Sequence, residues 1–352
     1  MNTARSTGTR AGLIEPSDLQ ALFLVWAPPT LGSSRSREFA KELGIVELQY
    51  VYSTLKRGVF SAPLRYSYQA VQTLRLLFAK RPQVVFVQSP PSIAVLFVYL
   101  YSAVTGSRYV IDAHSGALQL PYWTRPQWLH RFLMRRAAVC IVTDEYFQEM
   151  IEDGGGLAFV LKDPVTEYHQ VEYPLYGDFN ITVVNTFSDD EPLEEVLKAA
   201  AGLSNVRFYI TGKKEDAPPQ VLAQAPANVQ YTGYLPNKLY YGLLSASNAV
   251  MCLTTHDHTL QCGACEALSL GKPIITSDWT LLRDYFNCGT VHVPNTSEGI
   301  RKGVLEIMHN YDRYLVGIKE LQTVKRQEWK KKVEELNRLI RSSSGSVTGL
   351  KS

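Results

Sequence analysis

Cysteine is scarce in this chain, with five cysteines among 352 residues. Domains that depend on a disulfide framework carry a much denser set, so we expect a reducing, cytoplasmic setting. Charged residues make up 20% of the chain and hydrophobic residues 45%, which excludes a disordered protein or a coiled coil. The length suits two domains better than one.

Long apolar runs are also missing. The most apolar stretch, residues 93–104, is closed by Thr105 and Arg108, whereas a membrane-spanning helix needs about 20 apolar residues. We therefore interpret this stretch as a buried helix of an α/β domain. The first twelve residues are polar and have no apolar core, so no signal peptide is expected.

Charge is unevenly divided along the chain. Residues 1–140 contain 16 Lys and Arg against 6 Asp and Glu, whereas the remainder contains 20 against 27. The basic N-terminal half favours an anionic acceptor or an anionic lipid surface as a partner. Ordinary solvated surface charge is the alternative explanation.

Apolar runs alternate with helical patterns from Ala21 onward, which is typical of βαβ units and parallel sheets. The predicted strands are residues 22–26, 46–51, 84–88, 109–112 and 139–143, and then 181–184, 206–211, 229–231, 249–253, 273–276 and 289–293. The pattern predicts two open α/β domains in tandem. Such sheets bind ligands beyond the carboxyl ends of their strands.

The most informative segment is residues 262–278, which read Cys-Gly-Ala-Cys-Glu-Ala-Leu-Ser-Leu-Gly-Lys-Pro-Ile-Ile-Thr-Ser-Asp. It predicts a short helix, a Gly-Lys-Pro stop and a buried strand. Gly263 and Ala264 would leave N–H groups uncovered at the helix N-terminus, where the helix dipole favours an anion. Glu266 is an acceptor placed to hold hydroxyl groups. The segment therefore indicates a site for a phosphate that carries a ribose or a sugar.

This segment closely resembles the nucleotide-sugar signature of GT-B glycosyltransferases, in particular family 4 (group 1). Members usually carry two glutamates separated by seven residues, a Gly-x-Pro turn and a hydrophobic strand. Glu266 matches the second glutamate and residues 271–273 match the turn, while His258 stands at the first glutamate position. The resemblance implies an α/β GT-B fold, with two Rossmann-like parallel-sheet domains facing an interdomain cleft.

The resemblance also implies a function. A sugar would move from a nucleoside-diphosphate sugar to a glycan or lipid-linked acceptor, with retention, in polysaccharide or cell-surface glycan synthesis. Neither a cofactor nor a metal would be needed. The implied domains are a polar tail (1–18), an acceptor-side domain (19–170), a nucleotide-sugar domain (171–318), a helix returning to the first domain (319–341) and a flexible tail (342–352).

The donor site is expected in the second domain, where the resemblance runs from about residue 179 to 310. The loop that opens this domain is acidic at residues 188–191, where many members carry Arg and Lys. Lys213 or Lys214 is the candidate substitute, with a solvated turn lysine as the alternative. The predicted donor-binding residues are Thr186, Lys213, Tyr234, Leu235, His258, Cys262, Gly263, Ala264 and Glu266.

Two histidines and a Cys-x-x-Cys pair lie within ten residues, at His256, His258, Cys262 and Cys265. Such a group can hold zinc or form a redox pair. However, the cysteines straddle the predicted phosphate-binding turn, and no second ligand cluster follows along the sequence. We therefore predict no metal site and favour His258 as a contact of the donor phosphate or sugar.

In the first half, the segment at residues 109–117 begins with a hydrophobic strand that delivers Asp112 and His114 to its carboxyl end, and Ser115 and Gly116 open the next turn. By resemblance, His114 contacts the donor sugar, although a histidine satisfied within its loop is the alternative. The predicted catalytic residues are His114, Asp112 and Glu266. Gly32, Arg35 and Ser89 are predicted on the acceptor side, where Arg35 and Arg37 could contact an acceptor phosphate or simply start a helix.

Residues 123–136 combine aromatic side chains with four arginines. On a helix, Trp128, Phe132 and Leu133 could share a face and seat the protein on an anionic bilayer, at the inner face of the membrane. A core-facing amphipathic helix is the alternative. No recognised nucleic-acid module surrounds these arginines, so no nucleic-acid partner is expected.

Two other functions fit the same architecture. A nucleotide-sugar epimerase would need additional acid/base carboxylates, for which the sequence offers Asp112 and Asp144. A catalytically inactive nucleotide-sugar-binding subunit is suggested by His258 and by the acidic loop at residues 188–191.

Overall fold

The computed structural model describes residues 20–342 except 30–33, 46, 56–57 and 59. The chain forms two compact units, each with its own core. The first runs to Lys162 and resumes at Trp329, and the second is Asp163–Glu328. These limits lie several residues from the predicted boundaries at 170/171 and 318/319. The predicted tails, 1–18 and 342–352, lie outside the described residues except for Ser342.

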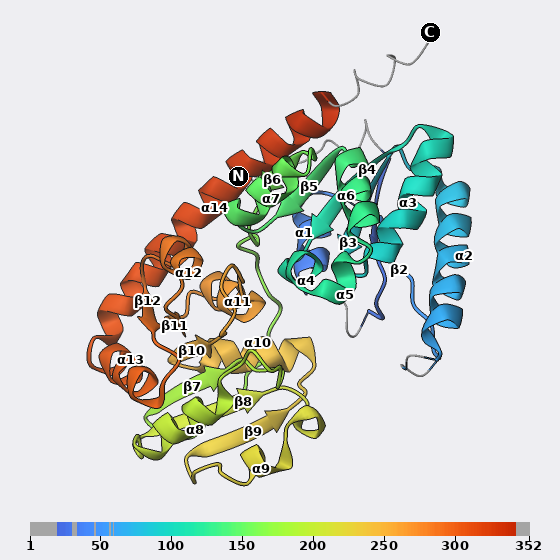
Figure 1. The fold of residues 1–352 in the computed structure, drawn as a ribbon. Coiled ribbons are helices and arrows are strands. Elements are labelled where there is room, and N and C mark those ends of the chain that lie inside the picture. The colour runs from blue at the N-terminus through green and yellow to red at the C-terminus, as the bar shows by residue number, and fades with distance from the viewer. Residues whose placement is uncertain (1–19, 30–33, 46, 56–57, 59, 343–352) are drawn as a thin grey trace, which may run out of the picture. The chain divides into compact units, whose positions relative to one another are not determined.

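The first unit is built on a parallel six-stranded sheet in the order β2-β1-β3-β4-β5-β6 (Figure 1). Its strands are β1 (Ala21–Val25), β2 (Glu47–Tyr50), β3 (Val84–Ser89), β4 (Arg108–Ala113), β5 (Val139–Val142) and β6 (Ala158–Val160). The first five correspond to predicted strands. β6 was not predicted because its three residues give too short an apolar pattern to recognise.

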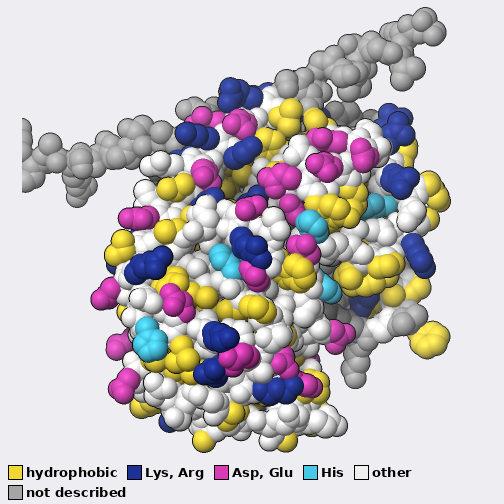
Figure 2. Space-filling model, turned by 60° about the vertical axis from the view of Figure 1, so that its left-hand side comes forward, with side chains coloured by type: hydrophobic (Ala, Val, Ile, Leu, Met, Phe, Trp, Pro, Cys, Tyr) yellow, Lys and Arg dark blue, Asp and Glu magenta, His cyan; other side chains and the backbone are white. Residues whose placement is uncertain are grey.

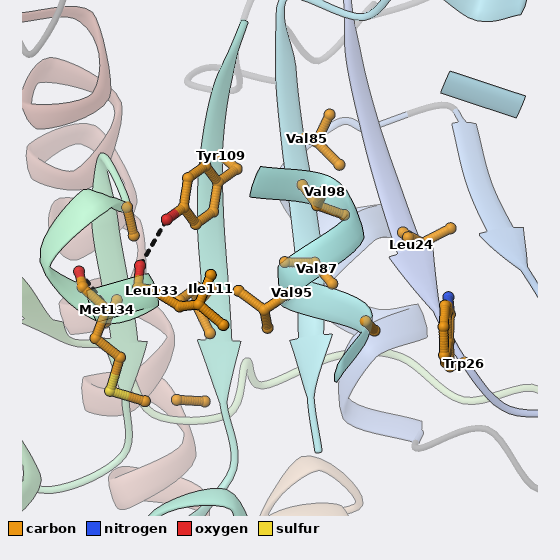
Figure 3. Packing of buried hydrophobic residues seen from close by; sticks show 14 of the residues in the cluster. Leu24, Trp26, Val85, Val87, Val95, Val98, Tyr109, Ile111, Leu133 and Met134 are labelled. Atoms are coloured by element: carbon orange, nitrogen blue, oxygen red, sulfur yellow. Dashed lines mark hydrogen bonds between the residues drawn. The ribbon is translucent and has the colours of Figure 1, made fainter. Parts of the chain in front are cut away.

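Helices cover both faces of this sheet. They are α1 (Ser34–Glu42), α2 (Ala62–Lys80), α3 (Ser92–Thr105), α4 (Ser115–Gln119), α5 (Pro121–Thr124), α6 (Gln127–Arg136) and α7 (Glu145–Asp153). On one face, Val85, Val87 and Ile111 point toward α3 and α6 (Figure 3). The Tyr109 hydroxyl donates to the Leu133 carbonyl at 2.6 Å and so satisfies the polar end of a buried ring.

The apolar stretch at residues 93–104 is indeed a helix of this domain, because α3 buries Val95, Val98 and Tyr101 in the core. Within the described part of the chain, no helix is long and apolar enough to cross a membrane.

The second unit repeats the plan with a parallel sheet in the order β12-β11-β10-β7-β8-β9 (Figure 1). Its strands are β7 (Phe179–Val183), β8 (Val206–Thr211), β9 (Val229–Gly233), β10 (Ala249–Cys252), β11 (Ile274–Ser277) and β12 (Thr290–Val293). Its helical segments are α8 (Leu193–Ala201), η1 (Lys214–Asp216), α9 (Pro219–Leu222), α10 (Asn237–Ala246), α11 (Cys262–Ser269), α12 (Thr280–Tyr285) and α13 (Ser297–His309). All six predicted strands of this half are present.

The last helix, α14 (Tyr311–Ser342), contributes to both cores. Ile318 and Leu321 pack in the core of the second unit. Trp329 and Val333 pack in the core of the first unit, where the indole of Trp329 meets the ring of Phe39 edge-on at 6.2 Å. Acidic, basic and apolar side chains are interspersed on the face of the molecule shown in Figure 2.

Candidate functional site

A pocket of about 490 Å³ opens in the second unit beyond the carboxyl ends of β7 and β8 and beside the start of α11. This is the edge at which parallel α/β sheets bind ligands. Six of the nine predicted donor-binding residues line it, namely Thr186, Tyr234, Leu235, Cys262, Gly263 and Glu266.

The start of α11 is pressed against the sheet. A Cβ on Gly263 would lie 2.7 Å from Cγ1 of Val184 and 2.9 Å from Sγ of Cys252, so only glycine fits without a shift. Ala264 is fully buried in the core below. No side chain caps this helix at Gln261. The close packing therefore brings an N-terminus without a side-chain cap to the wall of the pocket.

Glu266 lies on the first turns of α11 and is held by a residue of the neighbouring helix. The hydroxyl of Tyr240 on α10 donates to Oε2 of Glu266 at 2.7 Å. Burial, together with the nearby Glu266 carboxylate, raises the pKa of Tyr240 well above its usual value. Tyr240 therefore remains a neutral donor at physiological pH and fixes the orientation of the carboxylate.

The acidic loop after β7 binds its own backbone. Oε2 of Glu191 accepts hydrogen bonds from the N–H of Thr186 at 2.7 Å and of Ser188 at 3.0 Å. Oδ2 of Asp190 accepts one from the Thr254 hydroxyl at 2.6 Å. Burial raises the pKa of Glu191, and the two N–H groups offset this only in part. In this conformation the N–H groups of Thr186 and Ser188, at the edge of the pocket, are already hydrogen-bonded to the Glu191 carboxylate.

Two of the remaining predicted donor residues stand beside the pocket and are not among the residues that line it. Nζ of Lys213 lies 5.9 Å from the ring centroid of Tyr234, which does line the pocket. His258 has a left-handed backbone (φ 56°), and its N–H donates to Oδ1 of Asp257 at 2.7 Å. Their contacts with a donor stay predictions.

In the first unit, Asp112 and His114 lie at the end of β4 as the sequence predicted. Asp112 is fully buried, and its Oδ1 is 3.2 Å from Nη2 of Arg35. Its Oδ2 lies 3.3 Å from Nε2 of His114. Burial opposes the charge on Asp112, but Arg35 and His114 outweigh it and hold its pKa below the usual value.

Arg35 stands at the start of α1, is only 4% exposed and also donates to the Leu161 carbonyl at 3.1 Å, so it belongs to a buried ion pair. Its contact with an acceptor phosphate stays a prediction. Ser89 is also buried, and its carbonyl accepts the N–H of His114 at 2.9 Å. Gly32 lies outside the described residues.

Several residues of the pocket were missed from the sequence. Tyr240, Asn185, Asn237 and Gln261 line it as well. The partner of Tyr240 is 26 positions away, and no local pattern signals such a pairing. Among the residues that the structure describes, no group of three or more His, Cys, Asp or Glu gathers to hold a metal ion.

Residues 180–310 match the family model described as "Glycosyl transferases group 1". The second unit is a group 1 glycosyl transferase domain. A search of curated protein sequences finds no match. The whole chain, however, is similar in structure to solved proteins of the GT-B type, so it has the GT-B fold, as the sequence predicted.

One solved structure similar to this GT-B protein is sucrose-phosphate synthase from Thermosynechococcus elongatus, at a TM-score of 0.67 and 12% identity, covering 92% of this chain and 98% of that one. HepE from Anabaena in complex with UDP-glucose has a TM-score of 0.68 and 12% identity, with 92% and 100% covered. A structure described as a UDP-N-acetylglucosamine 2-epimerase from Listeria monocytogenes has a TM-score of 0.61 and 12% identity, with 92% and 96% covered.

Proposed function

We propose that this protein transfers a sugar from a nucleoside-diphosphate sugar to a glycan or lipid-linked acceptor with retention, as in family 4 glycosyltransferases. The observation that carries the proposal is the Glu266 carboxylate, oriented by Tyr240 beside the start of α11 in a pocket of the group 1 domain. The complex of HepE with UDP-glucose makes UDP-sugars the first donors to examine.

In this proposal, Glu266 holds hydroxyl groups of the donor ribose through charge-assisted hydrogen bonds. The diphosphate lies at the start of α11, where N–H groups and the helix dipole stabilise its developing charge as the sugar departs. Lys213, whose Nζ lies 5.9 Å from the ring centroid of Tyr234, would add positive charge, and His258 would contact the donor phosphate or sugar. His114 contacts the sugar, and Asp112 holds its imidazole in place as a positioning residue.

The acceptor side of the proposal rests on the charge of the first half of the chain. A glycan or lipid-linked acceptor used in polysaccharide or cell-surface glycan synthesis would bring the protein to the inner face of an anionic membrane as a peripheral protein. We propose that transfer needs no cofactor. Undiminished transfer in the presence of a metal chelator would support this part, and restoration by added Mn²⁺ would contradict it.

An epimerase is the second candidate, because one similar structure is described as such an enzyme. It would need free acid/base carboxylates. Asp112 is buried in its ion pair with Arg35, and Asp144 caps α7 by accepting the N–H of Tyr146. Both carboxylates have structural partners, so the transferase explains these residues better.

Incubation with a panel of UDP-sugars, with and without lipid-linked glycan acceptors, tests the proposal. Acceptor-dependent release of UDP with formation of a glycosylated product is expected from the wild type. Loss of this activity in Glu266→Gln, with transfer unchanged in Glu298→Gln on the exposed surface of α13, would place it in this pocket. Inversion of the sugar without transfer would identify an epimerase, and UDP binding without turnover an inactive subunit.

A further inference from the structure

Negative charge is almost absent from a long part of the first unit. Between Glu47 and Asp144 the only acidic residue is Asp112. Asp112 is fully buried and paired with Arg35, so it contributes nothing to the surface. The same segment contains eleven Lys and Arg. Lys56 and Arg57 lie outside the described residues, and Lys80 pairs with Glu47 at 2.9 Å. The other basic residues of the segment have no exposed acidic residue of the same segment to pair with, so this part of the chain is net positive and complements an anionic partner.

Helix α2 carries apolar side chains on its outer face as well as on its inner one. Its inner face buries Ala70 and Leu77 in the core. On the outer face, Leu64, Tyr68, Val71, Arg75 and Phe78 follow a spacing of three or four residues, which aligns them along one side of a helix. Leu64 is 64% exposed and each of the other three apolar residues is about half exposed.

The apolar outer face continues beyond the N-terminus of α2. Phe60 is fully exposed, and Tyr52 and Leu55 are more than 40% exposed. Residues 49–55 and α2 form the walls of a groove of about 700 Å³. None of the described residues that line the groove is charged. We call the outer stripe of α2 together with Phe60 and Leu55 the α2 surface.

For residues 123–136 the sequence left two alternatives open, membrane contact and a core-facing helix, and the structure decides between them. On α6, Leu133 is buried and Phe132 packs edge-on against Tyr99 at 5.1 Å. Only Trp128, at 71% exposure, points away from the core. The three residues therefore do not form one exposed face, and the core-facing alternative holds for α6.

We propose that the α2 surface docks on an anionic phospholipid bilayer. Apolar side chains such as Leu64, Tyr68 and Phe60 enter the headgroup boundary, and Arg75 lies on headgroup phosphates. The inference deepens the peripheral membrane contact of the proposed function, on which it rests, by assigning it to specific residues. It also places any lipid-linked acceptor beside the uncharged groove.

A second copy of this chain is a less suitable occupant. In a two-fold symmetric dimer the α2 surface of one copy would contact the α2 surface of the other copy. Two α2 surfaces would bring arginines together and supply no carboxylate for them, because α2 contains no Asp or Glu. A bilayer that contains phosphatidylglycerol supplies both the apolar phase and the negative charge.

The test is cosedimentation of the full chain with vesicles of phosphatidylcholine alone and of phosphatidylcholine with phosphatidylglycerol. We expect wild-type protein to bind the anionic vesicles, with weaker binding at high salt. Replacing Leu64 and Tyr68 together by Glu should lower the partition coefficient by more than about tenfold, because two apolar anchors are lost. Arg75→Glu should lower it by at least about fivefold.

Val316→Glu combined with Val324→Glu is the matched control, since both valines are exposed on α14. This variant should bind vesicles as the wild type does. Circular dichroism and UDP titration of all variants separate loss of docking from loss of the fold or of the donor site. Equal vesicle binding by the α2 variants and the wild type would overturn the assignment. So would wild-type binding to neither vesicle, or a dimer that the α2 substitutions dissociate.

Discussion

Tyr240 and Glu266, 26 positions apart, join α10 to α11 through a hydrogen bond of 2.7 Å. The bond links the carboxylate that the sequence signature points to with a tyrosine that the signature does not include. Both residues line the same pocket, so a change in one alters the shape of the site around the other.

Tyr240→Phe removes the hydroxyl that donates to Oε2 of Glu266 at 2.7 Å. A hydrogen bond to a charged group contributes about 1.5–3 kcal/mol, so we expect UDP to bind roughly tenfold more weakly. Isothermal titration calorimetry measures this. Tyr314→Phe is the matched control, because it removes a Tyr-to-Glu306 bond of 3.0 Å elsewhere in the same unit. Equal UDP affinities of the wild type and Tyr240→Phe would show that the bond does not shape the site.

The raised pKa of Glu191 predicts that both the stability of the protein and its affinity for the donor depend on pH. The pKa of Glu191 is raised above the usual 4.5, so the folded protein holds this proton to higher pH than the unfolded chain does. Stability therefore falls as pH rises from 4.5 through the raised pKa. UDP affinity should fall over the same window, because ionised Glu191 adds to the negative charge of Asp190 and Glu266 at the pocket.

Glu191→Gln should remove this part of the pH dependence and bind UDP several-fold more tightly above the window. Calorimetric titrations across a pH series measure both effects, with Glu194→Gln, at an exposed position of α8, as the control. An unchanged pH profile in Glu191→Gln would assign the dependence to other groups.

Gly263→Ala tests the close approach of α11 to the sheet. The added Cβ would meet Val184 and Cys252 at less than 3 Å. Because α11 must shift to relieve this overlap, we expect a loss of about 1–3 kcal/mol in the free energy of unfolding, together with weaker UDP binding. Gly116→Ala in α4 is the control, since among the described residues its Cβ would meet a side-chain carbon of Leu120 at 3.5 Å and nothing nearer. Chemical denaturation compares the two, and similar losses would contradict the packing argument.

Arg35→Met should destabilise the first unit by about 3–5 kcal/mol, because Asp112 would be left buried without its main counter-charge. The stability that Asp112 provides is complete above its usual pKa of 3.8 and is lost as pH falls through the lower value in the folded protein. Arg283→Met, which breaks an exposed pair with Asp278, should have little effect. If both variants unfold at the same denaturant concentration, the Arg35–Asp112 pair is not a stabilising element.

The strands could be predicted because each buries a run of apolar residues, and the pocket wall at α11 because its small residues and Glu266 lie within one short segment. The side chains that pair with the predicted residues could not be predicted. Arg35 reaches Asp112 across 77 positions, and Tyr240 reaches Glu266 across 26. Sequence periodicity reports which face of an element is buried, but it does not report which polar side chains meet there.

Sequence periodicity also could not decide between membrane contact and core packing for residues 123–136. An apolar helix face has the same spacing whether it packs on a sheet or faces a membrane. Only the fold shows that Leu133 of α6 is buried while Leu64 of α2 is exposed.

The most direct test of the donor pocket is calorimetric titration of the wild type and Glu266→Ala with UDP, GDP, ADP and TDP, with Glu298→Ala as the control. The proposed site predicts that the wild type binds one nucleotide selectively, that Glu266→Ala loses this binding and that Glu298→Ala retains it. Folded wild-type protein that binds none of the four, or a Glu266→Ala variant that binds as tightly as the wild type, would contradict it.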